Sequence, residues 1–193
     1  RRRTHPHLHT IWGALGDVNG DGVLDPIMGG AGTYAVISLA LSTAIDFQHV
    51  LGGWDGATGE FLEGWPRQVE DFQFLVAPAI ADVSGDGQPE VIYTSAGYVV
   101  GAWDASGRIP EGWPKFTGQW VLGSPAVGDI TGDGYLDLVV TSSGFTPEDQ
   151  MRFFVNDGKG GFIDRTKEAV LTGLVGGLNC QQTDYNNDGL IDI

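Results

Sequence analysis

The sequence lacks several features that would place it in common protein classes. No run of about 20 consecutive apolar residues occurs in its 193 residues, so we expect no membrane-spanning helix. The single cysteine, Cys180, cannot form an internal disulfide and is expected to be a small buried hydrophobic residue. Basic residues are scarce: 10 Lys and Arg against 25 Asp and Glu give a formal net charge of -15. This charge opposes binding to nucleic acid.

Common catalytic signatures are also missing. The sequence contains no nucleophile-elbow, zinc-protease or phosphate-loop motif. Glu60 with Glu63, or Glu148 with Asp149, could form an acid pair for glycoside chemistry. Sequence alone does not distinguish these pairs from ordinary loop acids.

Two smaller clusters have simple interpretations. His5, His7 and His9 alternate, so in a strand they would share one face and could hold a transition metal, but a solvated terminus is the favoured interpretation. The glycines within 29–32 do not complete a dinucleotide-binding pattern and are expected to form a turn. Segment 28–53 is expected to hold an insertion or a lengthened hairpin.

The most informative feature present is one pattern that occurs four times. The copies are GDVNGDGVLDPI at 16–27, ADVSGDGQPEVI at 81–92, GDITGDGYLDLV at 128–139 and TDYNNDGLIDI at 183–193. Successive leading Asp residues are 65, 47 and 55 residues apart. These intervals match the roughly 40–50 residues of a four-stranded propeller blade, with an insertion in the first interval.

Short β-rich segments surround the copies. They precede the second and third copies at 76–83 and 122–130, and they follow them at 90–95 and 136–143. The predicted unit is therefore a strand, an acidic loop and a second strand. A further strand that runs into a tight turn is predicted at 98–107.

Tryptophans recur with the same period. The Trp-Pro pairs at 65–66 and 113–114 are predicted to pack between adjacent blades. Trp12 and Trp120 lie in or just before predicted inner strands and are expected in the core. The alternative for the tryptophans is an exposed platform for sugar rings.

The spacing of oxygen-bearing residues in each copy predicts a calcium loop. Ligands at the first, third, fifth and ninth positions, a backbone carbonyl at the seventh and a turning Gly at the sixth suit a hard cation. The predicted ligands are Asp17, Asn19, Asp21, Val23 and Asp25; Asp82, Ser84, Asp86, Gln88 and Glu90; Asp129, Thr131, Asp133, Tyr135 and Asp137; and Asp184, Asn186, Asp188, Leu190 and Asp192. About four structural calcium ions would thus engage twelve of the 25 acidic residues.

Two alternatives to calcium loops share part of this pattern. An EF-hand requires a Glu at the twelfth position and flanking helices, whereas Met28, Tyr93 and Val140 stand there and the flanks are strand-like. Metal-free turns rich in Asp and Gly would also fit the composition. Three carboxylates within nine residues repel one another without a cation, which favours calcium.

The four loops resemble the FG-GAP/VCBS repeats of integrin alpha-subunit-like β-propellers, and SPAVGDITGDGYLDLVV is closest to bacterial extracellular members. The segment 156–169 is similar to the VCBS variant. No copy has a literal Phe-Gly and Gly-Ala-Pro pair; the triplets at 77–79 and 124–126 stand in their place. The resemblance implies a calcium-binding propeller that works outside the cell.

We therefore expect an all-β fold of four-stranded antiparallel propeller blades. Three blades (1–72, 73–119 and 120–175) and the start of a fourth (176–193) would form part of a larger propeller of about seven blades. The expected function is a non-catalytic binding, adhesion or surface-assembly scaffold that takes a protein or glycan on a propeller face or assembles with itself. The alternative is the propeller portion of a secreted polysaccharide lyase or hydrolase.

Overall fold

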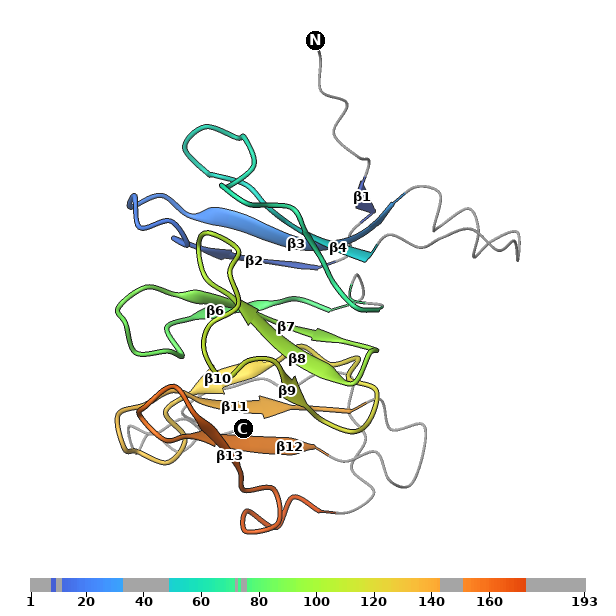
Figure 1. Cartoon of the computed structure of the whole chain (residues 1–193), viewed down its shortest axis with the longest axis vertical. Coiled ribbons are helices and arrows are strands. Elements are labelled where there is room, and N and C mark those ends of the chain that lie inside the picture. Colours follow the sequence, from blue (N-terminus) through green and yellow to red (C-terminus); the bar gives the residue numbers. More distant parts are fainter. Residues whose placement is uncertain are drawn as a thin grey trace, which may run out of the picture.

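The computed structural model shows an all-β arrangement (Figure 1). It describes residues 8–9, 12–32, 49–71, 73, 76–142 and 151–172. Every regular element within these ranges is a β-strand. The described residues include no helix long and apolar enough to cross a bilayer.

The strands form three antiparallel sheets, which we call the first, second and third blades. The first blade contains β1 (Leu8–His9), β2 (Gly13–Gly16), β3 (Asp25–Gly32), β4 (His49–Gly53) and β5 (Arg67–Gln68); the second contains β6 (Ala79–Ala81), β7 (Glu90–Ser95), β8 (Val99–Trp103) and β9 (Lys115–Phe116); the third contains β10 (Ala126–Gly128), β11 (Asp137–Val140), β12 (Arg152–Asn156) and β13 (Phe162–Asp164). Consecutive strands pair within the second and third blades, as the predicted four-stranded units require.

The first blade differs from the others at β3. This strand has eight residues and pairs with β2 near Asp25 and with β1 near Gly32, so β1 and β2 share one edge. The glycines within 29–32 lie inside β3, and the prediction that they form a turn is wrong. A Cβ at Gly29 would collide with the buried side chain of Gln73, so close packing explains a glycine within a strand here.

The blades lie one upon another in chain order (Figure 1). One apolar cluster joins the first and second blades around Ile27, Leu51 and Tyr93. Another joins the second and third blades around Ile92 and Leu138. In the described part of the chain, the three sheets stack as propeller-like blades without closing a ring.

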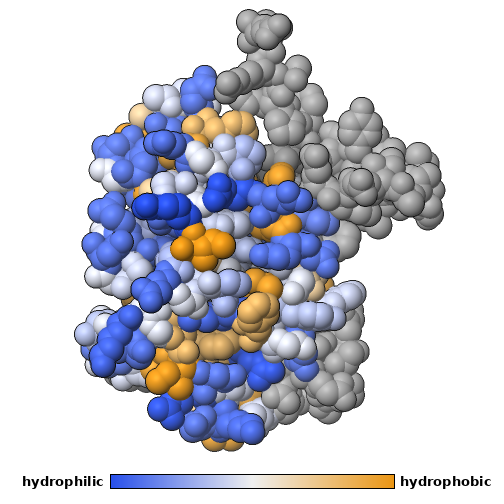
Figure 2. Space-filling model, in the orientation of Figure 1, coloured by the Kyte–Doolittle hydropathy of each residue, from blue (hydrophilic) through white to orange (hydrophobic). Residues whose placement is uncertain are grey.

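The middle blade is covered on both faces. All six residues of β7 are buried: Val91 and Tyr93 contribute to the first cluster, and Ile92 contributes to the second. The run Val91–Tyr93 is therefore apolar and buried on both faces of the sheet, whereas β2 alternates between exposed and half-buried residues. The visible surface in this orientation is mainly hydrophilic, with separate hydrophobic spots (Figure 2).

Both Trp-Pro pairs pack between blades, as the repeat period predicted. The ring of Trp65 lies edge-on to that of Trp103 with centroids 5.8 Å apart, and its Nε1 donates to the Ala105 carbonyl oxygen at 3.3 Å. Trp113 contacts Phe162 of the third blade in a similar way, at 5.3 Å. Both Trp-Pro peptide bonds are cis.

The prediction that Trp12 and Trp120 lie in the core is wrong. Their exposed fractions are 61% and 46%. Trp12 precedes the exposed edge strand β2, and Trp120 lies in the connection between β9 and β10. Neither side chain is therefore placed between two sheets, where Trp65 and Trp113 are held.

Candidate metal-binding loops

The first three acidic segments join β2 to β3, β6 to β7 and β10 to β11 in the three blades. They run from Asp17 to Asp25, from Asp82 to Glu90 and from Asp129 to Asp137, and the flanking elements are strands. Each loop has glycine with positive φ at the fourth and sixth positions: Gly20 (78°), Gly22 (86°), Gly85 (78°), Gly87 (88°), Gly132 (74°) and Gly134 (90°). These two left-handed residues wind nine residues into a tight turn.

The leading Asp of each loop accepts backbone hydrogen bonds from the fifth and sixth residues, and Asp82 accepts a third from Gly85 N–H. Asp17 Oδ1 accepts from Asp21 N–H at 3.0 Å, and its Oδ2 accepts from Gly22 N–H at 2.9 Å. Asp82 and Asp129 accept from the equivalent N–H groups of their own loops. The loops therefore share one backbone conformation that their own side chains hold.

The closing carboxylates are almost completely buried. The exposed fractions are 0% for Asp25, 2% for Glu90 and 0% for Asp137. Asp25 Oδ2 accepts from the N–H groups of Val18 and Asn19 at 3.0 and 3.3 Å. Burying a carboxylate is costly unless it is hydrogen-bonded, so these contacts account for its position.

In two loops, the other oxygen of the closing carboxylate accepts a hydrogen bond from the end of the next strand or the turn after it, at β4 in the first blade and β12 in the third. Asp25 Oδ1 accepts from Gly56 N–H at 2.9 Å, and Asp137 Oδ1 accepts from Asn156 N–H at 3.0 Å. The ninth position thus fastens the acidic loop to the hairpin that follows it. Sequence reasoning assigned this residue to calcium alone and did not predict its role in the hairpin.

The second loop brings three carboxylates together. Asp82, Asp86 and Glu90 each offer an oxygen, and these oxygens all lie within 4.8 Å of one another. Among the described residues, only this group meets that spacing. Glu90 has one more methylene than Asp25 or Asp137 and can extend farther into its loop.

The donor set of the second loop fits a hard cation. Burial raises the pKa of the Glu90 carboxyl, and the charge of Asp86 raises it further, while the N–H groups of Val83 and Ser84 lower it. The hydroxyl of Ser84 also lies near enough to lower this pKa, but it is buried without a hydrogen bond of normal geometry. Ca²⁺ prefers oxygen ligands, and this group supplies three carboxylates with a hydroxyl beside them.

The other predicted ligands are placed as follows. Asn19 Oδ1 accepts from Asp21 N–H at 3.0 Å, while Thr131 is exposed. Val23, Gln88 and Tyr135, predicted to bind through their carbonyl oxygens, are exposed at the seventh positions. The ligands predicted for the fourth loop, Asp184, Asn186, Asp188, Leu190 and Asp192, lie outside the described residues, as do His5, His7, Glu148, Asp149 and Cys180.

Comparison with known families gives a direct result. The family described as FG-GAP-like repeat matches residues 82–140 and 129–193, which together make up more than half of the chain. The chain belongs to the FG-GAP-like repeat family. Both matches of this FG-GAP chain begin at the leading Asp of an acidic loop, Asp82 or Asp129. The copy at Asp17 lies outside the matched residues.

A solved structure shows the same kind of fold. The V. cholerae biofilm matrix protein Bap1 matches with a TM-score of 0.57 and 22% sequence identity. The match covers 97% of this FG-GAP chain but only 28% of the Bap1 chain. No curated protein matches the sequence.

Proposed function

We propose that this FG-GAP chain is a calcium-stabilised propeller segment that serves outside the cell as a non-catalytic binding or assembly scaffold. The observation that carries the proposal is the group Asp82, Asp86 and Glu90, with the unsatisfied Ser84 hydroxyl beside it. Calcium at this site would neutralise the crowded carboxylates and join the two strands that flank the loop. The first and third loops share the backbone conformation of the second, and on this basis we propose that they bind calcium through the equivalent residues.

The chemistry of such loops supports an extracellular location. Extracellular calcium modules bind with dissociation constants of roughly 0.1–1 mM, a concentration that is met outside cells but not in the cytosol. A binding site of this strength would add stability only in the outer environment. The description of Bap1 as a biofilm matrix protein supports the same location, although this chain spans 28% of it.

Within this proposal, the chain is divided into blades at 1–72, 73–119 and 120–175, with a fourth beginning at 176, and the intact propeller has about seven. The ligand would be a protein, a glycan or another copy on a propeller face. The enzymatic alternative rests on acidic pairs: Glu60 and Glu63 are both exposed, and Glu148 with Asp149 lies outside the described part of the chain.

Thermal unfolding tests the proposal. The purified chain is heated with excess EGTA, then with millimolar Ca²⁺ and, as a control for ionic strength and charge, with Mg²⁺. We expect Ca²⁺ to raise the melting temperature and Mg²⁺ to do so much less, with about four Ca²⁺ bound per chain by elemental analysis. An unchanged melting temperature together with no bound calcium would show that the loops are metal-free turns.

A further inference from the structure

A small open pocket lies at the end of the third blade opposite its acidic loop. Arg152, the first residue of β12, pairs with Val140 at the end of β11, whereas the acidic loop ends at Asp137 at the beginning of β11. The pocket has a volume of about 280 Å³, just below the usual range for sites that bind drug-sized molecules. Its lining residues are Arg152, Asp164, Thr166, Lys167, Glu168 and Thr172.

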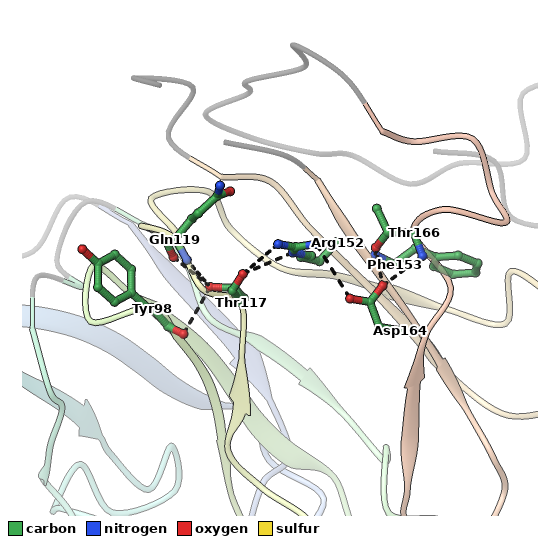
Figure 3. Close-up of polar contacts among 7 residues, drawn as sticks. All are labelled: Tyr98, Thr117, Gln119, Arg152, Phe153, Asp164 and Thr166. Atoms are coloured by element: carbon green, nitrogen blue, oxygen red, sulfur yellow. Dashed lines mark hydrogen bonds and ion pairs between the residues drawn. The ribbon is translucent and has the colours of Figure 1, made fainter. Parts of the chain in front are cut away.

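Hydrogen bonds fix the guanidinium group in this pocket. Arg152 Nε and Nη2 donate to the Thr117 carbonyl oxygen of the second blade at 3.2 and 3.0 Å (Figure 3). Its Nη1 lies 3.8 Å from Asp164 Oδ2. The side chain is partly exposed, so a ligand can reach a guanidinium whose orientation is already set.

The neighbouring carboxylate is held equally firmly. Asp164 Oδ1 accepts from the backbone N–H and the hydroxyl of Thr166, at 3.0 and 2.5 Å. The Thr166 hydroxyl in turn accepts from Phe153 N–H at 3.0 Å, and this threonine is buried. Both groups are therefore held in place. Asp164 Oδ2 can accept a hydrogen bond from a ligand, and the neighbouring Arg152 guanidinium can donate one.

The charge and donor pattern indicate the class of ligand. Arg152 and Lys167 are balanced by Asp164 and Glu168, so the lining carries no formal net charge. The surrounding chain is strongly acidic, which disfavours a phosphate or carboxylate ligand. Adjacent hydroxyl groups of a sugar both donate and accept hydrogen bonds, so they match a guanidinium beside a carboxylate.

Two exposed aromatic residues lie in the second blade, close along the backbone to the Thr117 carbonyl that Arg152 binds. The Tyr98 carbonyl oxygen accepts from Thr117 N–H and Oγ1, and Figure 3 shows Tyr98 and Arg152 on opposite sides of Thr117. The exposed fractions of Tyr98 and of Phe116, which precedes Thr117, are 46% and 75%. Tyr98 also has a φ of 64°, which is rare for a bulky residue and easy for glycine. An exposed ring is thus kept at a position that favours glycine, which points to a binding role.

We propose that the pocket binds one pyranose ring of a neutral saccharide, and that the exposed Tyr98 contacts a further ring of the same glycan. Arg152 and Asp164 would bind adjacent ring hydroxyls, with Lys167 as a further donor. The apolar face of that sugar would lie on the Tyr98 ring. This inference rests on the proposed scaffold function, for which it supplies the ligand class and the site.

The test is an NMR titration of the ¹⁵N-labelled chain in Ca²⁺. The probes are methyl glucoside, methyl galactoside and methyl mannoside, then the disaccharides maltose, lactose and cellobiose, and for comparison methyl glucuronide and inorganic phosphate. We expect at least one neutral sugar to shift the signals of Arg152, Thr166 and Lys167, and a disaccharide to shift Tyr98 as well. Lys167→Ala and Asp164→Asn should each weaken binding by about two- to tenfold.

Two matched variants separate binding from folding. Arg108→Ala removes an exposed arginine of the second blade, near the acidic-loop end, and should leave sugar binding unchanged. Tyr98→Gly suits the positive φ, so it should keep or raise the melting temperature while it weakens disaccharide binding. Arg152→Ala is less informative because this side chain also joins two blades.

Several outcomes would overturn the proposal. In the titration, these are no response to any sugar at tens of millimolar, shifts confined to other surfaces, or a stronger response to glucuronide or phosphate. In the variants, it is sugar binding that Lys167→Ala and Asp164→Asn leave unchanged. The calcium-dependent melting temperature of the same sample distinguishes the two proposals. Sugar binding without a calcium effect would refute calcium stabilisation alone, and a calcium effect without sugar binding would refute only the pocket.

Discussion

The side-chain amide of Asn156 donates a hydrogen bond of 3.1 Å to the carbonyl oxygen of Val83 in the neighbouring blade. The same amide also donates to the Leu136 carbonyl oxygen at 3.2 Å, and the Asn156 N–H donates to Asp137. One buried residue of β12 therefore connects the acidic loop of the third blade to the loop of the second.

Replacement of Asn156 is expected to weaken this connection. Asn156→Ala leaves two carbonyl oxygens without their donor and should lower the free energy of unfolding by about 1–3 kcal/mol. Urea unfolding in EGTA measures the change without a contribution from calcium. Gln68→Ala, on the exposed surface of β5, is the control and should change stability by less than about 0.5 kcal/mol. Equal effects of the two variants would contradict the bridging role.

The Glu90→Gln variant should have opposite effects with and without calcium. Burial raises the pKa of Glu90, so folding without calcium favours the neutral form, and a neutral amide should leave the melting temperature equal or higher. For the same reason, lowering the pH toward this pKa should stabilise the calcium-free wild type relative to the variant. With Ca²⁺ present, the variant has lost a charged ligand and should melt below the wild type. A variant that melts lower under both conditions would contradict this interpretation.

The fourth position of the loops should accept asparagine better than alanine. Gly85 has a φ of 78°, and a Cβ there would meet no atom within 4 Å, so only backbone conformation opposes a side chain. Gly85→Ala should lower stability by about 1–2 kcal/mol, and Gly85→Asn by less, because Asn tolerates this conformation. The fourth copy has Asn187 at this position of its sequence. Denaturant midpoints of the two variants decide the order, and equal losses would count against it.

Trp113 should be among the most sensitive side chains of the second blade. It is buried against Phe162 and belongs to the cluster that joins the second and third blades. Trp113→Ala should lower stability by about 3–5 kcal/mol, as large core truncations do. Trp120→Ala, on the exposed connection that follows β9, should change it by less than about 1 kcal/mol. Guanidinium unfolding monitored by circular dichroism compares them, and similar losses would show that Trp113 does not join the blades.

Local sequence patterns predicted the strands and the acidic loops well. The Asp and Gly spacing determines a turn through contacts within nine residues, so the conformation of the loop at Asp82 follows from its own sequence. The period of the Trp-Pro pairs correctly placed Trp65 and Trp113 between blades. The ligand assignments themselves stay predictions.

Features that depend on neighbouring sheets were not predicted. Trp12 and Trp120 have the composition of core residues, but their exposure depends on whether another sheet covers them. The role of Asn156 depends on the position of Val83, 73 residues away, and no local pattern encodes that distance. The crowding at Glu90, compared with Asp25 and Asp137, depends on side-chain length within one backbone conformation.

The covering of the middle blade on both faces makes the described stack a one-dimensional array with nearest-neighbour coupling. Opening the first or third blade breaks one interface of this array, whereas opening the second breaks two. Amide hydrogens of β7 and β8 should therefore exchange most slowly with solvent, and fluctuations should spread inward from the outer sheets. A ligand that contacts two neighbouring blades would then stabilise the interface between them.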